Sequence, residues 1–226
     1  MSFTRVKYGQ VEPNQLSAQK TGQIYASLPL DPDVKILQNG EFMYYDYQTN
    51  KVSADDSTGI SEPMLVFNEI KLYEPFWRTS YKDFAMIRVD AVNAAGTTVA
   101  GENYVTSDLA TNGPIEGQYG GGALTPGVAA NPAHPDYPYR MTGMAPRLFK
   151  TNVGDIFTTN MVETDDDAGQ EVTYTVGNLL EPVKNTTTKT LQLKKATGTP
   201  TGMAWVVVKV YQMPDGQPGL KLQRVQ

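Results

Sequence analysis

Proline and glycine recur along the whole chain, and their frequency is the feature that most limits its fold. The 226 residues include 15 prolines and 20 glycines. Proline lacks a backbone donor and glycine loosens the backbone, so regular elements between them are expected to be short. Thirteen tyrosines, seven phenylalanines and two tryptophans suit half-buried sheet surfaces. We therefore predict an all-β fold, an antiparallel sandwich or barrel-like domain, with 40% hydrophobic residues available to build its core.

Residues 1–33 are predicted to form an extended N-terminal arm outside the sheet. One or two helical turns are expected over residues 13–20, ending at Thr21-Gly22, where glycine suits a helix C-cap. The prolines that follow, at positions 29 and 32, disfavour regular pairing. Two interpretations stay open: the arm lies on a neighbouring molecule, or it packs on its own domain.

Residues 34–90 and 146–226 are the β-rich parts, as one sheet system or two packed parts. The dipeptide Asn39-Gly40 predicts a hairpin between strands 35–38 and 41–47. Further strands are predicted over residues 63–73, 84–89, 147–150, 155–159, 171–176, 189–195, 203–213 and 220–225. The strand over residues 203–213 is the most hydrophobic, so we expect it to be central and covered on both faces.

Residues 91–145 are predicted to be a long loop insertion. They hold nine of the 20 glycines and five prolines but only five charged residues. Glycine and proline at this density exclude strand interiors, and solvated linkers are normally rich in charge. We therefore expect this loop to become ordered against a neighbouring surface.

Most reactive side chains are missing from the chain. It contains one histidine and no cysteine, and no G-x-S-x-G motif occurs. His134 stands between prolines in the insertion, where a surface position is expected. The acidic run at residues 165–167 carries oxygen ligands for a hard cation, but a solvated hairpin tip is its more ordinary role. We predict no catalytic residue, no metal ligand and no cofactor, and therefore no enzyme.

Charge and hydropathy exclude two further classes of partner. The net charge is −5, whereas a nucleic-acid-binding protein is expected to show a basic face. Lys184, Lys189, Lys194 and Lys195 are scattered among threonines, as on a solvated strand. No apolar run reaches the roughly 20 residues of a membrane span, and the first ten residues show no secretory signal.

Aromatic residues leave one binding function open. They would suit a platform for sugars, although sheet proteins more often place such residues in their cores. The residues in question are Tyr44, Tyr45, Tyr47, Tyr73, Phe76, Trp77 and Tyr81.

Several stretches of the chain resemble a family of tailed-bacteriophage virion proteins. The first is residues 8–25 (YGQVEPNQLSAQKTGQIY), followed by residues 37–47 (LQNGEFMYYDY) and 64–74 (MLVFNEIKLYE). Residues 78–84, 146–160 and 208–219 match as well. The resemblance covers the arm and both β-rich parts and is weakest over residues 91–145. Proteins of this family are described as head decoration, cement or head-fibre-type structural proteins.

The resemblance implies a non-enzymatic structural protein that binds the outside of a phage capsid and decorates or stabilises it. Its partners would be the major capsid protein and neighbouring virion proteins, with self-association possible and no nucleic acid or membrane involved. It would be made in the host cytoplasm and reside on the capsid exterior. A head-fibre, neck or tail structural protein, or a glycan- or receptor-binding module, is the alternative. The arm and the loop are expected to carry the contacts, through Tyr8, Gln10, Leu16, Ile24, Tyr25, Leu28, Tyr119, His134, Tyr137 and Tyr139.

Overall fold

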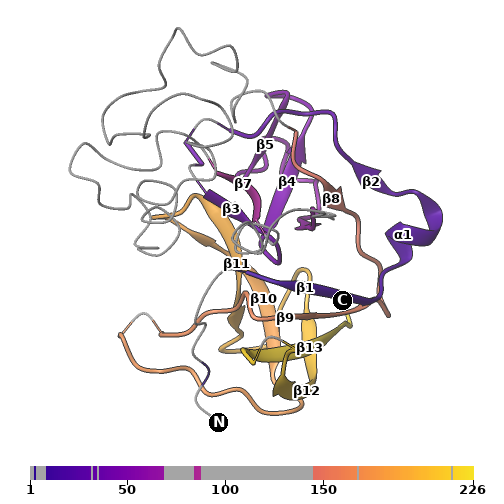
Figure 1. Cartoon of the computed structure of the whole chain (residues 1–226). Coiled ribbons are helices and arrows are strands. Elements are labelled where there is room, and N and C mark those ends of the chain that lie inside the picture. The colour runs from indigo at the N-terminus through magenta and orange to yellow at the C-terminus, as the bar shows by residue number, and fades with distance from the viewer. Residues whose placement is uncertain are drawn as a thin grey trace, which may run out of the picture.

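The fold is built almost wholly of antiparallel strands, as predicted. Figure 1 shows the computed structural model. It describes residues 3, 9–31, 33–34, 36–68, 84–87, 145–166, 168–214 and 216–226. Apart from the five-residue helix α1 (Ser17–Thr21), the named elements within these residues are strands, and all pairings between them are antiparallel. This short helix is neither long nor apolar enough to cross a membrane.

Eleven strands form one sheet, and two more form a separate pair. The strands are β1 (Val11–Gln15), β2 (Ile24–Tyr25), β3 (Ile36–Gln38), β4 (Phe42–Asp46), β5 (Lys51–Ser53), β6 (Met64–Val66), β7 (Phe84–Ile87), β8 (Leu148–Phe149), β9 (Ile156–Thr159), β10 (Leu179–Asn185), β11 (Thr190–Lys195), β12 (Trp205–Gln212) and β13 (Pro218–Arg224). The large sheet runs β1-β9-β13-β12-β10-β11-β4-β6-β8-β2, with β5 attached to β4, and the small one is β3-β7.

The large sheet curls back on itself as a half-barrel. Strands β8 and β9 lie near its opposite ends, yet they belong to one stretch of chain, and α1 joins β1 to β2 in the same way. Phe42 of β4, Phe157 of β9 and Trp205 of β12 fill the interior, with ring centroids 4.8 to 6.3 Å apart. No two of these strands are neighbours in the sheet, so their rings meet across it. Curling therefore gives the chain one aromatic core.

The prediction that residues 1–33 stay outside the sheet is wrong. Strand β1 pairs with β9 and β2 pairs with β8, so the described part of the arm packs on its own domain. Leu16 is 1% exposed and Ala18 is buried beside it, which supplies the apolar contacts that hold the segment in place. Pro13 is tolerated because β1 is an edge strand with a single partner. Of the helix predicted over residues 13–20, only the second half is confirmed, as α1, because residues 13–15 belong to β1. Gly22 ends the helix with a φ of 71°.

The predicted hairpin at Asn39-Gly40 is also wrong. The chain turns there, but β3 pairs with β7, and β4 pairs with β5, β6 and β11. The N–H of Gly40 donates to the carbonyl of Val66 at 2.9 Å, and the Glu41 carboxylate accepts the N–H of Gln38 at 2.7 Å. In a two-residue hairpin the N–H of Gln38 and the carbonyl of Glu41 would bond each other. Here the Glu41 carboxylate takes the first and the N–H of Val66 takes the second, so the turn links strands of two different sheets.

Strand β12 is central over its first half only. Between Val207 and Lys209 the register with β13 shifts by one residue, and the extra residue, Val208, is 39% exposed. The bulge returns Val210 to the core side, where it packs against the buried cluster. Beyond the bulge the pairing with β10 has ended, because that pairing involves only the first two residues of β12. The expectation that both faces of this strand are covered is therefore wrong.

The remaining strand predictions divide into three groups. Strands within residues 84–89, 147–150, 155–159, 189–195 and 220–225 are confirmed as β7, β8, β9, β11 and β13. Residues 171–176 form an irregular loop with isolated bridges, so the strand predicted there is wrong. Of the strand predicted over residues 63–73, β6 is present, and the part after residue 68 lies outside the described residues.

Candidate functional site

The predicted insertion, residues 91–145, falls within a longer stretch, residues 68–146, whose two ends meet in the large sheet. Strand β6 precedes it, β8 follows it, and the two are paired. One step further out, the N–H of Phe67 donates to the carbonyl of Arg147 at 3.2 Å, and the Phe67 ring lies 5.3 Å from that of Phe149. The insertion is therefore carried on a base that is closed by the sheet. Strand β7 belongs to this stretch but precedes the predicted insertion, and it pairs with β3.

The ten predicted contact residues divide evenly by position. Outside the described residues lie Tyr8, Tyr119, His134, Tyr137 and Tyr139. The other five belong to the N-terminal segment: Gln10, Leu16, Ile24, Tyr25 and Leu28. Leu16 is a core residue of this chain, and Gln10 is buried, with its backbone N–H bonded to Asn160 Oδ1 at 2.7 Å. Ile24, Tyr25 and Leu28 are half-buried, so they alone of the five present substantial accessible surface.

Three tyrosines come together where β2 and β4 face each other. The rings of Tyr25 and Tyr45 lie 5.2 Å apart, and those of Tyr45 and Tyr47 lie 5.0 Å apart. Tyr45 is buried and its hydroxyl bonds the side chain of Ser27, whereas Tyr47 is 66% exposed. Tyr44 points away from this group and is half-buried, and its burial together with nearby Asp56 raises its pKa. Part of the predicted aromatic group is thus assembled, with one ring open to solvent, and Tyr73, Phe76, Trp77 and Tyr81 lie outside the described residues.

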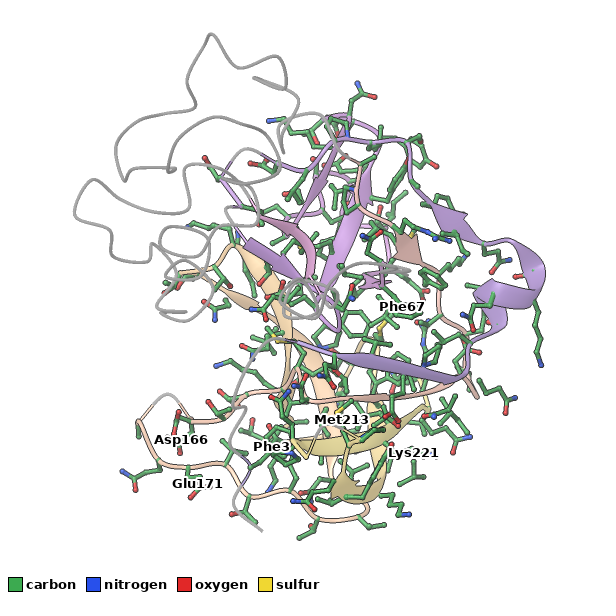
Figure 2. All side chains as sticks on the ribbon, in the orientation of Figure 1. Phe3, Phe67, Asp166, Glu171, Met213 and Lys221 are labelled. Carbon is green, nitrogen blue, oxygen red and sulfur yellow. The ribbon has the colours of Figure 1, made fainter. Side chains whose placement is uncertain are left out.

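The acidic run forms the exposed tip of a loop, as expected. Asp166 donates its N–H to the carbonyl of Gln170 at 2.8 Å, and its carboxylate accepts the N–H of Gln170 at 2.8 Å. Asp166 and Glu171 lie on the loop at the lower left of Figure 2. Gly169 completes the turn with a φ of 74°. Asp167 lies outside the described residues.

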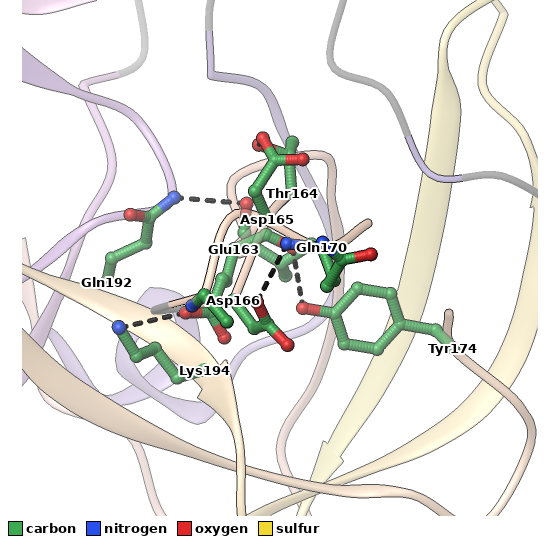
Figure 3. A network of polar contacts seen from close by, with 10 residues as sticks. Glu163, Thr164, Asp165, Asp166, Gln170, Tyr174, Gln192 and Lys194 are labelled. Carbon is green, nitrogen blue, oxygen red and sulfur yellow. Dashed lines mark hydrogen bonds and ion pairs between the residues drawn. The ribbon is translucent and has the colours of Figure 1, made fainter. Parts of the chain in front are cut away.

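The base of this acidic loop is fixed by a polar network, drawn in Figure 3. The carboxylate of Glu163 pairs with Lys194 of β11 at 2.8 Å, and its backbone carbonyl accepts the hydroxyl of Tyr174 at 2.7 Å. Burial raises the pKa of Tyr174, and the charge of Glu163 raises it further. The ring of Phe3 packs edge-on against Tyr174 at 5.5 Å. These contacts therefore tie the two sides of the acidic loop to each other, to strand β11 and to Phe3.

Two buried carboxylates, which sequence analysis did not single out, join segments that are far apart in the chain. Glu41 is 2% exposed and accepts bonds from the N–H of Gln38 at 2.7 Å and from the Thr190 hydroxyl at 2.8 Å. Asp155 accepts the N–H of Ser17 at 3.0 Å and its hydroxyl at 2.8 Å. Hydrogen bonds to a carboxylate are stronger than those between neutral groups. Each of these carboxylates therefore acts as a structural clamp.

A third carboxylate organises the turn between β4 and β5. Asp46 accepts the backbone N–H groups of Gln48 at 2.8 Å and Thr49 at 3.2 Å, and it also accepts the hydroxyl of Ser57. The hydrogen bond from Ser57 and the two backbone bonds lower the pKa of Asp46 to about 2. The ionised form is therefore the one that holds this loop.

The described residues contain no group of three or more histidine, cysteine, aspartate or glutamate side chains arranged to hold a metal ion. Two of the four lysines at the β10–β11 hairpin are paired with acids, Lys184 with Asp55 and Lys194 with Glu163, and Lys195 donates to the carbonyl of Thr173 at 3.2 Å. The ion pairs of Lys184 and Lys194 therefore stabilise loops of this same chain.

No family model, no curated protein and no solved structure matches this chain. The resemblance to virion proteins is therefore carried forward only as a proposal.

Proposed function

We propose that this protein is a non-enzymatic structural protein of a phage virion, which docks on the outside of the capsid and decorates or stabilises it. The observation that carries the proposal is the closed base of the insertion, where Phe67 and Arg147 are hydrogen bonded and β6 pairs with β8. A rigid scaffold that presents a long loop is the usual arrangement for binding. Residues 8–25, 37–47 and 146–160 resemble phage virion proteins, and this resemblance indicates a capsid protein as the partner.

The composition of the insertion supports a contact role. Residues 91–145 combine glycine, proline and tyrosine with few charges, and such a loop loses little electrostatic solvation when it meets another surface. Ordering a long segment costs free energy, which lowers the affinity of a single copy. Many copies at fixed positions on a capsid offset that cost through avidity if they contact one another.

Most of the N-terminal segment belongs to the fold, so only its accessible side chains are proposed to contact a partner. Since Leu16 and Ala18 lie in the core, deleting residues 2–33 would remove two strands and part of the core together. If that deletion abolished binding, the cause could be either a lost contact or a damaged fold. The accessible side chains of the segment, Ile24, Tyr25 and Leu28, stay in the proposal as a secondary contact.

The β6–β8 base and strand β7 lie outside residues 91–142, so these residues can be removed while those strands are kept. Residues 91–142 are replaced by a short Gly/Ser linker, and binding is measured by co-sedimentation with heads of the encoding phage that lack the protein. We expect the variant to keep its far-ultraviolet circular dichroism and its urea midpoint and to lose head binding. Val176→Ser, a change at an exposed residue on a different loop, is the control and should bind as the wild type does. Wild-type binding by the loopless variant would refute the role of the insertion.

The tyrosine cluster supports a second candidate, a glycan-binding module. Tyr47 is exposed and rests edge-on against Tyr45, which is how a ring is held ready to stack on the apolar face of a sugar. A glycan array probed with the wild type and with Tyr47→Ala tests it. Hits that the substitution abolishes would favour this function, and an array without hits would remove it.

A further inference from the structure

The segment formed by β1, α1 and β2, here called the N-terminal ribbon (residues 11–25), takes its strand partners from one stretch of the chain. Side chains add contacts with β12 and β4, because the Tyr211 hydroxyl donates to Glu12 at 2.7 Å and the Tyr25 ring lies 5.2 Å from that of Tyr45. Strand β1 pairs with β9 from Val11 opposite Thr159, and β2 pairs with β8 up to Tyr25 opposite Leu148. Among the described strands, neither β1 nor β2 has a second partner. Figure 1 shows the ribbon running beside the stretch that contains β8 and β9, which we call the acceptor (residues 148–159).

The ribbon completes the core instead of merely lying on it. Leu16 and Ala18 are fully enclosed, and Ile24 packs against the same buried cluster. Between the two strands, the N–H and hydroxyl of Ser17 donate to the carboxylate of Asp155, and the Asn152 side chain donates to the Ser17 hydroxyl at 2.7 Å. An acceptor without a ribbon would expose the apolar slot of Leu16 to water, while Asp155 would keep the N–H of Asn152 at 2.9 Å, so burial of the slot favours filling it.

The link between the ribbon and the rest of the chain is short, and it is held by the hydrogen bond between the Ser27 and Tyr45 hydroxyls and by one from the N–H of Val52 to the carbonyl of Pro29 at 2.8 Å. Residues 26–29 contain no strand, three of the four are exposed, and the next buried anchor is Leu30. Pro29 fixes its own φ and keeps the residue before it extended, so this link disfavours a compact turn. Short hinge loops of this kind invite exchange of a terminal element between copies.

We propose that the N-terminal ribbon of one copy can fill the acceptor of a second copy of this chain. The contacts are the same in both cases, because the Leu16 slot and the Asp155 carboxylate are identical in every copy. Reciprocal exchange closes a dimer, and one-way exchange links copies in a row. This inference concerns the chain's own self-association and holds whatever surface the protein docks on.

The chain lacks cysteine, so introduced thiols report pairing without interference. Gln15 lies opposite Ile156 in the β1–β9 register, and both side chains retain exposed surface. Full-length Gln15→Cys and full-length Ile156→Cys are mixed, unfolded in urea, refolded together at high concentration and oxidised. We expect a disulfide between the two variants at a yield several-fold above that of the control mixture, Gln15→Cys with Val176→Cys.

Two further samples make the result decisive. The double variant Gln15→Cys/Ile156→Cys at high dilution should form its disulfide within one chain, which establishes that the two positions are close enough to bond. If it does not, the whole test is repeated with Glu12→Cys and Thr158→Cys, which are also opposite each other in the β1–β9 register. Lengthening the link by three glycines after Ser27 should lower the yield between chains, because a longer link lets each ribbon return to its own acceptor. A mixed yield equal to that of the control mixture would overturn the proposal.

Discussion

Replacing Leu16 with alanine tests whether the N-terminal segment belongs to the core. Leu16 is 1% exposed and lies between β1 and α1, enclosed by the buried cluster. Truncation of an enclosed leucine costs about 2–5 kcal/mol, and the anchoring of both flanking elements limits how far the cavity can collapse. We therefore expect a loss of about 3 kcal/mol in the free energy of unfolding, within that range. In a chain of this size that loss lowers the melting temperature by roughly 6–12 °C.

Urea unfolding followed by circular dichroism measures this loss directly. The midpoint should fall while the slope m stays the same, because the surface exposed on unfolding barely changes. Gln15→Ala is the matched control, since residue 15 is the exposed neighbour of Leu16 and should shift stability by about 0.5 kcal/mol or less. An arm lying outside the fold predicts equal, small effects for the two substitutions. That result would refute the placement of Leu16 in the core.

Two more predictions concern the turns. Gly40 and Gly154 both have a φ of 96°, but a Cβ on Gly40 would lie 2.5 Å from a threonine hydroxyl, whereas one on Gly154 meets nothing within 4 Å. Gly40→Ala should therefore lower the urea midpoint clearly more than Gly154→Ala, and equal shifts would contradict the close packing at Gly40. Asp46 has a pKa lowered from 3.8 to about 2 by Ser57 and by backbone N–H groups, so its stabilising effect is complete above about pH 4 and is lost as the pH falls toward about 2. In the Asp46→Asn variant the urea midpoint should fall less steeply as the pH is lowered from about 4 to about 2. A fall as steep as that of the wild type would mean that other carboxylates cause the acid destabilisation.

Local signals predicted the elements that depend on local chemistry. Gly22 ends the helix where glycine was expected as a C-cap, with a φ of 71°. The alternation of apolar residues likewise located β11 and most of β12. Each of these signals is contained within a few neighbouring residues.

The errors lie where a distant partner decides the outcome. The Asn39-Gly40 turn is not a hairpin because Glu41 is held by Thr190, which is 149 residues away. Strand β1 was missed because it is short, contains a proline and gains its stability from β9, some 145 residues further along the chain. The clamp at Asp155 was missed for the same reason, since an aspartate beside a glycine turn has nothing in its own sequence to indicate Ser17 as its partner.

Strand β8 connects the two surfaces proposed to make contacts. Its two residues pair on one side with β6, at the base of the insertion, and on the other side with β2, at the end of the N-terminal ribbon. Phe149 is thus opposite both Leu65 and Ile24. A partner that orders the insertion stabilises β8, and a stabilised β8 holds β2 more firmly, so docking and ribbon exchange should oppose each other after assembly. Amide hydrogen exchange at Ile24 and Tyr25 should slow when heads bind the protein, and exchange rates that do not change would show that the two surfaces act independently.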